Sequence, residues 1–430
     1  MKMEPNTVNV IVENSGYGLD NLGDVAMLQA FIRRLGDRQP NAIFWVVSEE
    51  KENLLRCIPS VKFLPLEEKR MWVCSFNLVG GLQHFFPGKL KVWLTDCEAS
   101  FRTDYPEIAL KIISWRFGKS SEKYILCSRF VERIKDADMV VATGGGYITD
   151  NFSSHAVALL DVLRLAQSFD RPTAMVGQGV GPVSKPRLLK MIQQVYPGLL
   201  LLSMRERLLS PQIARSVIKK SCTELIVSGD DAIELAYERH PLTIGGKLGV
   251  NIRVAEYSEV LSDTLARVGK VINKFIASTQ IEYEVIPISL IEGHSDTEAV
   301  KSMLEENSVE ENRREDNISV VEVIERVGRC RVVVTGSYHA GVFALSQGVQ
   351  VVALTASKYY DSKFLGLQEQ FSSGLQLVHL DDNFEMALAD ALSRAWKEAD
   401  NERDSLLGAA GQQISIGKQA YDRLVKLCHD

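Results

Sequence analysis

His339 is the side chain in this sequence that is best placed to donate a proton to a ligand. It follows a β-branched run over residues 332–335 and a glycine, and a helix is expected to begin beside it. Ser337 and Tyr338 add hydroxyl groups directly before it. Because α/β proteins bind ligands beyond the carboxyl ends of parallel strands, His339 is a candidate general acid, although a single histidine is more often structural.

Three cationic side chains follow other expected strands. Arg205 follows a strand over residues 199–203, and its guanidinium could hold a phosphate or carboxylate by two hydrogen bonds. A salt bridge to a neighbouring acid explains Arg205 equally well. Lys358 and Lys363 follow a strand over residues 351–354, beside two tyrosines. A cavity lined by these segments would be cationic and rich in hydrogen-bond donors, which suits an anionic small molecule.

Glycine-rich turns at three further strand ends bring backbone N–H groups within reach of a ligand. Their candidate binding residues are Asn21, Gly23, Asp24, Gly144, Gly145, Gly146 and Gly179. Asp24 could instead cap the first helix. His155, which follows the glycines at 144–146, is more simply explained as a surface or helix-start residue. The turn at Gly179 is neither a Walker loop nor a dinucleotide fingerprint, which argues against an ATPase or a nicotinamide enzyme.

The composition is that of an ordinary globular protein, with 46% hydrophobic and 24% charged residues. A length of 430 residues predicts two domains of roughly 200 residues each. A net charge of −6 gives no reason to expect a nucleic-acid partner. The seven cysteines form no Cys-x-x-Cys pair, so neither disulfides nor a metal site is expected. The sequence shows no signal peptide or membrane span, which predicts a cytoplasmic protein.

One stretch suggests a possible peripheral contact with the inner face of a membrane. Residues 71–94 combine aromatic side chains with lysines, namely Trp72, Phe76, Phe85, Phe86, Lys89, Lys91 and Trp93. An insertion packed against its own domain explains the same residues more simply.

Short apolar runs alternate with segments of helical period, which predicts parallel sheets covered by helices. We expect an α/β protein with two Rossmann-like, doubly wound domains facing a cleft, in the GT-B manner. The predicted domains are residues 1–240, with an irregular insertion at about 66–130, and residues 241–430. Helices are expected at about 384–398 and 402–427, the second packing back on the first domain.

Taken in order, these segments resemble the polysaccharide pyruvyl transferase family. The matching elements are an Asn-x-Gly-Asp turn (Asn21, Gly23, Asp24), a glycine triplet (144–146), Gly-x-Gly-Pro (179–182), an Arg-Asp/Glu-x-x-Ser element (Arg205, Glu206 and Ser210, displaced by one residue), an Asp-rich segment (229–232) and a histidine segment (339–352). Each element is weak alone, and their common order over residues 21–352 carries the resemblance.

The resemblance implies transfer of a pyruvyl group from phosphoenolpyruvate to sugar hydroxyls of a polysaccharide or glycoconjugate precursor, forming a ketal. Phosphoenolpyruvate would be a co-substrate, no cofactor is implied, and the acceptor would be a glycan or lipid-linked sugar. His339 would be the acid, while Arg205 and Lys363 would hold the anionic groups of the donor.

The sequence departs from the family at Ser337, where many members carry an arginine, and at Gln350, where proline is usual. Lys358 or Lys363 could replace the missing cation. Two alternatives therefore stay open: a nucleotide-sugar glycosyltransferase on the same frame, or a non-catalytic relative that binds a glycan or partner.

Overall fold

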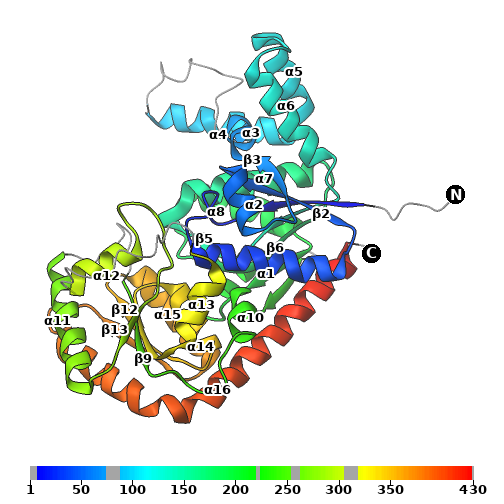
Figure 1. The fold of residues 1–430 in the computed structure, drawn as a ribbon. Helices are drawn as coiled ribbons and strands as arrows, with labels where there is room; N and C mark the ends of the chain where they lie inside the picture. Colours follow the sequence, from blue (N-terminus) through cyan, green and yellow to red (C-terminus); the bar gives the residue numbers. More distant parts are fainter. Residues whose placement is uncertain (1–6, 74–87, 219–222, 253–261, 305–317, 429–430) are drawn as a thin grey trace.

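The computed structural model describes residues 7–73, 88–218, 223–252, 262–304 and 318–428 (Figure 1). Two parallel β-sheets, one in each half of the chain, form its framework. Helices cover both, and a long C-terminal helix runs along the molecule from one to the other (Figure 1).

The first sheet has the strand order β3-β2-β1-β4-β6-β7-β8, with β5 paired to β6 outside this path. Its strands are β1 (Val8–Glu13), β2 (Ala42–Ser48), β3 (Lys62–Pro65), β4 (Met139–Ala142), β5 (Gly145–Ile148), β6 (Thr173–Val180), β7 (Leu201–Met204) and β8 (Glu224–Val227). All these pairings are parallel. Strand β4 is buried along its whole length, as expected for an apolar run in the centre of a covered sheet.

The second sheet has the order β10-β9-β11-β12-β13, again parallel throughout. Its strands are β9 (Lys247–Asn251), β10 (Tyr283–Val285), β11 (Cys330–Thr335), β12 (Gln350–Thr355) and β13 (Leu375–His379). The segment between the sheets contains the boundary at 240/241 that we propose between two domains.

The α-helices lie between and around these strands. They are α1 (Leu22–Arg38), α2 (Lys51–Cys57), α3 (Leu66–Val73), α4 (Gly88–Asp104), α5 (Pro106–Phe117), α6 (Glu122–Lys135), α7 (Ser153–Ser168), α8 (Pro186–Val195), α9 (Ser210–Val217), α10 (Ala232–Tyr237), α11 (Ser262–Thr279), α12 (Asp296–Leu304), α13 (Val320–Gly328), α14 (Tyr338–Ser346), α15 (Lys358–Phe371) and α16 (Phe384–Leu427).

The stretch at about 66–130 was expected to be irregular, and its described residues are instead mostly helical. Helices α3 to α6 build an arm that projects from the first sheet (Figure 1). Apolar residues on these helices do not keep to one face: in α5, Ile113 is buried while Trp115 is 87% exposed. Because apolar residues lie on both buried and exposed faces, the sequence lacks the 3.6-residue hydrophobic period from which a helix is normally predicted.

The two helices expected at 384–398 and 402–427 form one continuous helix, α16, of 44 residues. Residues 399–401 contain neither glycine nor proline, and Ala399 is fully buried, so nothing in the sequence ends the helix there. The helix contacts β11, β12 and β13 of the second sheet and also α1 and α10.

A buried polar cluster ties the end of α16 to the first sheet's helices. Tyr421 donates a hydrogen bond to Asp231 Oδ2 at 2.7 Å. Arg34 of α1 forms salt bridges with Asp231 and Glu234, and all three side chains are at most 4% exposed. Burial raises the pKa of Asp231 against the opposing charge of Arg34. At Glu234, Arg34 and Lys418 outweigh burial and lower the pKa.

We expect Arg34→Met to lower the free energy of unfolding by about 3–5 kcal/mol, because it leaves the buried Asp231 carboxylate without its cation. Glu234 keeps its salt bridges to Lys418 and Arg33. Arg33→Met is the matched control: Arg33 is 35% exposed at its side chain, so its salt bridges should contribute less than about 1 kcal/mol. Urea unfolding of both variants would measure the difference. Equal losses in the two variants would contradict this assignment.

Candidate functional site

A cavity of about 300 Å³ opens between the carboxyl ends of the two sheets. Residues from both halves of the chain line it, including Gly16, Asn21, Asp24, Gly146, Tyr147, His155, Arg205, Ser337, Tyr338, His339, Tyr359, Tyr360 and Lys363. A smaller recess lined by Gly179, Gly181 and Glu206 shares Gly146, Arg205, Tyr338 and Lys363 with this cavity. We call the larger cavity the central cavity.

The start of α1 brings the first glycine turn against the histidine segment. The Asn21 side chain accepts hydrogen bonds from the backbone N–H groups of Gly23 and Asp24, which caps the helix. A Cβ atom at Gly23 would lie 2.0 Å from Cγ of His339, so this position has no room for any side chain. Backbone hydrogen bonds between the turn and residues 288–290 also join the two halves of the chain.

Two cations from different sheets meet at the glycine triplet. A Cβ atom at Gly146 would lie 2.5 Å from an Nη atom of Arg205 and 3.1 Å from Nζ of Lys363. Because Gly146 has no side chain, the Arg205 and Lys363 side chains can both approach this residue. Arg205 comes from the end of β7 and Lys363 from the second turn of α15. Positive charge gathers at this point of the central cavity.

The Arg205 side chain is only 3% exposed and is held on several sides. Its guanidinium lies 3.5 Å from Asp230 Oδ2 and stacks over the Tyr338 ring, 4.1 Å from the ring centre. Its backbone carbonyl accepts a hydrogen bond from Gln370 of α15. Lys363 lies over the Tyr359 ring at 4.0 Å. Both cations are thus positioned before any ligand arrives.

His339 is buried at the start of α14, with Nε2 shielded from solvent and 3.8 Å from Asp230 Oδ2. Burial and the Arg205 and Lys363 charges lower the pKa of His339 well below its usual value. Burial raises the pKa of Asp230 to about 6, against the opposing effect of Arg205. The ligand-free cavity therefore holds a neutral imidazole beside an unusually basic carboxylate.

The sequence-predicted site residues do not all reach the cavity. Asn21, Asp24, Gly146, Arg205, Ser337, Tyr338, His339 and Lys363 line it, while Gly179 lines the adjoining recess. Gly23 packs on His339, Gly144 on Met27 and Gly177, and Gly145 on Tyr147. Lys358, at the exposed start of α15, lines neither space.

Sequence reasoning passed over two side chains at this site. Asp230 was noted only as part of an Asp-rich segment, although its place after β8 is a ligand-binding position in such sheets. His155 lies in the first turn of α7, as expected, and also lines the cavity between the Tyr17 and Tyr147 rings, at 5.0 and 5.2 Å. Burial lowers the pKa of His155 to about 3, so its imidazole is neutral.

The described residues offer neither a metal site nor a membrane span. No group of three or more His, Cys, Asp or Glu side chains among them is arranged to hold a metal ion. None of the described helices is both long and apolar enough to cross a bilayer. Of the aromatic residues expected to touch lipid, Trp72 is buried and Trp93 is 59% exposed. Phe76, Phe85 and Phe86 lie outside the described residues, as do the side chains of Lys89 and Lys91.

The family model named Polysaccharide pyruvyl transferase matches residues 21–358, which include the motifs that meet at the cavity. The chain belongs to the polysaccharide pyruvyl transferase family. This confirms the resemblance predicted from the ordered motifs. No curated relative matches the sequence.

Solved structures confirm the expected GT-B fold. A UDP-glucosyltransferase from Polygonum tinctorium superposes with a TM-score of 0.56 at 12% identity, covering 100% of both chains. UDP-GlcNAc 2-epimerase from Neisseria meningitidis, bound to UDP-GlcNAc, gives 0.55 at 9% identity, covering 98% of this chain and 100% of that one. At these identities the likeness concerns the fold alone.

Proposed function

We propose that this pyruvyl transferase family member transfers a pyruvyl group from phosphoenolpyruvate to two hydroxyls of one sugar in a glycan or lipid-linked glycan. The observation that carries the proposal is the convergence of Arg205 and Lys363 on Gly146, in the cavity that also holds His339. Phosphoenolpyruvate bears a phosphate and a carboxylate, and two preorganised cations match those charges.

The reaction requires proton transfers and breaks one C–O bond. The methylene carbon of phosphoenolpyruvate gains a proton and becomes a methyl group. Two sugar hydroxyls each lose a proton as their oxygens bond to the former enol carbon, and the bond from that carbon to the phosphate oxygen breaks. One of these protons balances the proton gained by the methyl group, and the other leaves with the phosphate. The products are a cyclic ketal and inorganic phosphate, with no change in overall oxidation state.

Binding of the donor would prepare His339 for its role as acid. A neutral imidazole cannot protonate a methylene carbon. A bound phosphate and carboxylate would offset the Arg205 and Lys363 charges that lower the pKa of His339, and so raise its proton affinity. Asp230, 3.8 Å from Nε2, would stabilise the imidazolium. Protonation of His339 would thereby depend on binding of phosphoenolpyruvate. Asp230 would act as a positioning residue for the imidazolium.

Incubation with phosphoenolpyruvate labelled with ¹³C at its methylene carbon tests the proposal directly. The acceptors would be methyl glycosides and lipid-linked sugars that carry two neighbouring free hydroxyls. We expect one acceptor to give a ¹³C methyl ketal signal together with an equal amount of inorganic phosphate. Phosphate release without a ketal signal from any acceptor would rule out pyruvyl transfer as described.

Ser337 lines the cavity at the position where many family members carry arginine. Its side chain is 6% exposed, and its backbone N–H donates to Thr335 Oγ1 at 2.8 Å. Because Arg205 and Lys363 already supply the cationic contacts, we expect Ser337→Arg to leave phosphoenolpyruvate affinity unchanged or to tighten it. Calorimetric titration of both proteins measures this. A Ser337→Arg variant that binds while the wild type does not would indicate that this chain has left the ancestral reaction.

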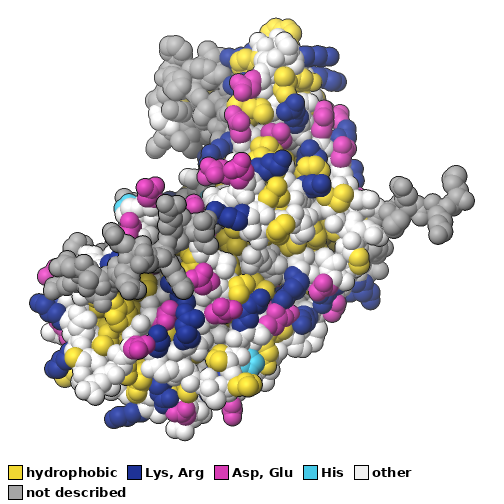
Figure 2. Space-filling view, in the orientation of Figure 1, with side chains coloured by type: hydrophobic (Ala, Val, Ile, Leu, Met, Phe, Trp, Pro, Cys, Tyr) yellow, Lys and Arg dark blue, Asp and Glu magenta, His cyan; other side chains and the backbone are white. Residues whose placement is uncertain are grey.

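We further propose that the projecting arm touches an anionic lipid surface. On α5 and its N-cap, Tyr105, Ile108 and Trp115 repeat at helical spacing and are 55%, 48% and 87% exposed. Lys111 and Arg116 are exposed beside them. Hydrophobic side chains with Lys and Arg next to them are visible on this arm in Figure 2. Apolar rings flanked by cations suit the headgroup region of a membrane.

Trp115→Gln should therefore weaken cosedimentation with vesicles of three parts phosphatidylcholine to one part phosphatidylglycerol by several-fold, because a tryptophan contributes strongly to interfacial binding. Met386→Gln is the control, since Met386 is 76% exposed but belongs to α16. If wild-type protein binds neither these vesicles nor pure phosphatidylcholine, the arm has another purpose.

A further inference from the structure

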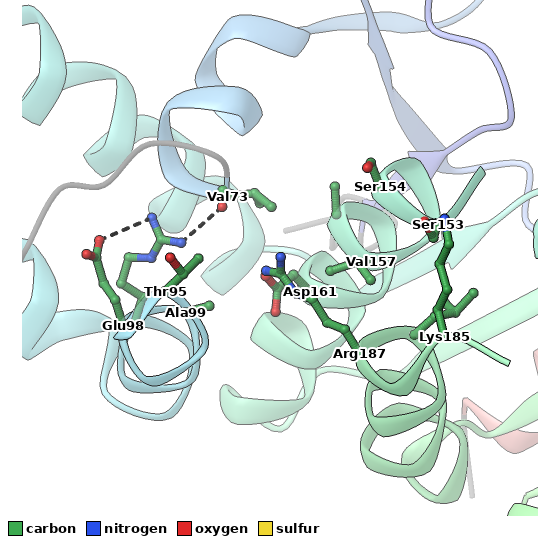
Figure 3. A pocket seen from close by; sticks show the side chains of 13 residues that line it. Val73, Thr95, Glu98, Ala99, Ser153, Ser154, Val157, Asp161, Lys185 and Arg187 are labelled. Atoms are coloured by element: carbon green, nitrogen blue, oxygen red, sulfur yellow. Dashed lines mark hydrogen bonds and ion pairs between the residues drawn. The ribbon is translucent and has the colours of Figure 1, made fainter. Parts of the chain in front are cut away.

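A second cavity, of about 390 Å³, lies at the base of the arm between α4, α7 and the start of α8. Its lining residues are Val73, Thr95, Glu98, Ala99, Arg102, Ser153, Ser154, Val157, Ala158, Asp161, Lys185, Arg187 and Leu188. Figure 3 shows Thr95 and Glu98 on one side of it, Ser153 and Lys185 on the other, and Asp161 between them. We call it the arm cavity. None of its lining residues belongs to the central cavity.

Asp161 is the unusual group in this cavity. Its side chain is buried, with the residue 7% exposed, yet no donor among the described residues forms a hydrogen bond or a salt bridge with its carboxylate. Burial raises its pKa to about 6, although Arg102 and Arg187 lower it from a distance. Because Asp161 lines the cavity, its carboxylate depends on hydrogen-bond donors within the cavity rather than on the described residues of the protein.

The cations of the arm cavity already have partners within the protein. Arg102 donates to the Val73 carbonyl at 3.0 Å and lies 3.9 Å from a Glu98 oxygen (Figure 3). Lys185 donates to the Asp150 carbonyl at 2.8 Å and to Ser153 Oγ at 3.0 Å. Arg187 pairs with Asp96 at 3.2 Å. The cations of the arm cavity are therefore engaged with other residues, and none of them forms a hydrogen bond or salt bridge with Asp161.

The charges that line the arm cavity indicate which kind of ligand it binds. An anion would be repelled by Asp161, and a cation would be repelled by the three cationic side chains around it. A neutral group with several hydroxyls can donate to the carboxylate and accept from Ser154. The apolar wall formed by Val157 and Leu188 suits the C–H face of a sugar ring. The volume lies in the range of small-molecule sites.

Neighbouring residues at the start of α7 line the two cavities. Phe152 and His155 line the central cavity, whereas Ser153 and Ser154 line the arm cavity. We infer that the arm cavity binds a neutral sugar unit of the acceptor glycan, one or more residues away from the sugar that reacts. The identification of this sugar as part of an acceptor rests on the proposed pyruvyl transfer, whereas the sugar-binding chemistry rests on Asp161 and its surroundings.

The test uses the full chain and saturation-transfer NMR with the methyl glycosides of glucose, galactose, mannose and N-acetylglucosamine. We expect at least one to bind, and Asp161→Asn to weaken that binding by about tenfold or more, because a charge-assisted hydrogen bond is lost. Asp170→Asn is the matched control, since Asp170 follows the exposed end of the same helix. It should bind like the wild type.

A second variant and a melting measurement exclude a merely structural effect. Ser154 is an exposed lining residue, so Ser154→Trp should block the cavity, abolish the Asp161-dependent signal and leave the fold intact. Asp161→Asn should not lower the melting temperature, because the carboxylate has no hydrogen bond or salt bridge with the described residues to lose. The inference is overturned if no glycoside binds, if binding survives in Asp161→Asn, or if it survives in Ser154→Trp.

The outcomes also separate this inference from the proposed function. Phosphoenolpyruvate affinity should be unchanged in Asp161→Asn, since Asp161 lies outside the central cavity. If ketal formation is observed without any Asp161-dependent sugar signal, the arm cavity has no part in acceptor binding. If the sugar signal depends on Asp161 but no ketal forms, the sugar site stands and pyruvyl transfer does not.

Discussion

His339→Ala is expected to lower turnover by roughly a hundredfold to ten-thousandfold, the usual contribution of a positioned general acid. The loss should fall on kcat, because Arg205 and Lys363 still hold the donor. The wild-type kcat should also decline as pH rises above the pKa of His339 in the donor complex, since only the imidazolium can donate the proton. This decline should be absent in the variant. Phosphate release at several pH values measures both effects.

Controls separate catalysis from packing, because His339 lies directly against Gly23. His339→Gln keeps most of the side-chain volume but has no titratable proton, and it should be nearly as inactive as His339→Ala. His379→Ala removes a histidine that is 51% exposed at its side chain and lies outside the cavity, and it should retain full turnover. Undiminished turnover in His339→Gln would remove His339 from the mechanism.

Arg205→Met is expected to weaken phosphoenolpyruvate binding by at least about tenfold. A hydrogen bond to a charged group contributes about 1.5–3 kcal/mol, and Arg205 offers a planar fork that methionine lacks. The substitution also leaves Asp230 without its cation, 3.5 Å away, which should lower stability. The binding measurement must therefore be made well below the melting temperature of the variant.

Lysine substitutions give the cleaner comparison. Lys363 is only partly buried, so Lys363→Met should fold normally and should also weaken donor binding by about tenfold. Lys358→Met changes a lysine of the same helix that is exposed and outside the cavity, and it should bind like the wild type. If Lys363→Met and Lys358→Met weakened phosphoenolpyruvate binding equally, the position of Lys363 in the cavity would not explain the affinity.

The fold and the positions of the motifs could be predicted from the sequence because parallel sheets impose a simple rule. Each β-branched run predicts a strand, and the turn after it must lie at the carboxyl edge, where ligands bind. That rule brought the segments of Asn21, Gly146, Arg205 and His339 to one edge. It did not predict β13, whose sequence, Leu-Gln-Leu-Val-His, is short and only partly buried.

Side-chain geometry across the two sheets could not be predicted in this way. The meeting of Arg205 and Lys363 at Gly146, and of Asp230 with both Arg205 and His339, depends on how the two halves of the chain are packed. Sequence spacing gives no information on that packing. The same limit explains Lys358, which follows the correct strand but is exposed and does not line the cavity.

Calorimetric titration of the wild-type protein with phosphoenolpyruvate, UDP-glucose and UDP-N-acetylglucosamine tests the central claim most directly. The Arg205–Lys363 pair and the neutral His339 predict that phosphoenolpyruvate binds, that its affinity falls in Lys363→Met but not in Lys358→Met, and that neither nucleotide sugar binds. Binding of a nucleotide sugar without binding of phosphoenolpyruvate would contradict the account and assign the cavity to glycosyl transfer.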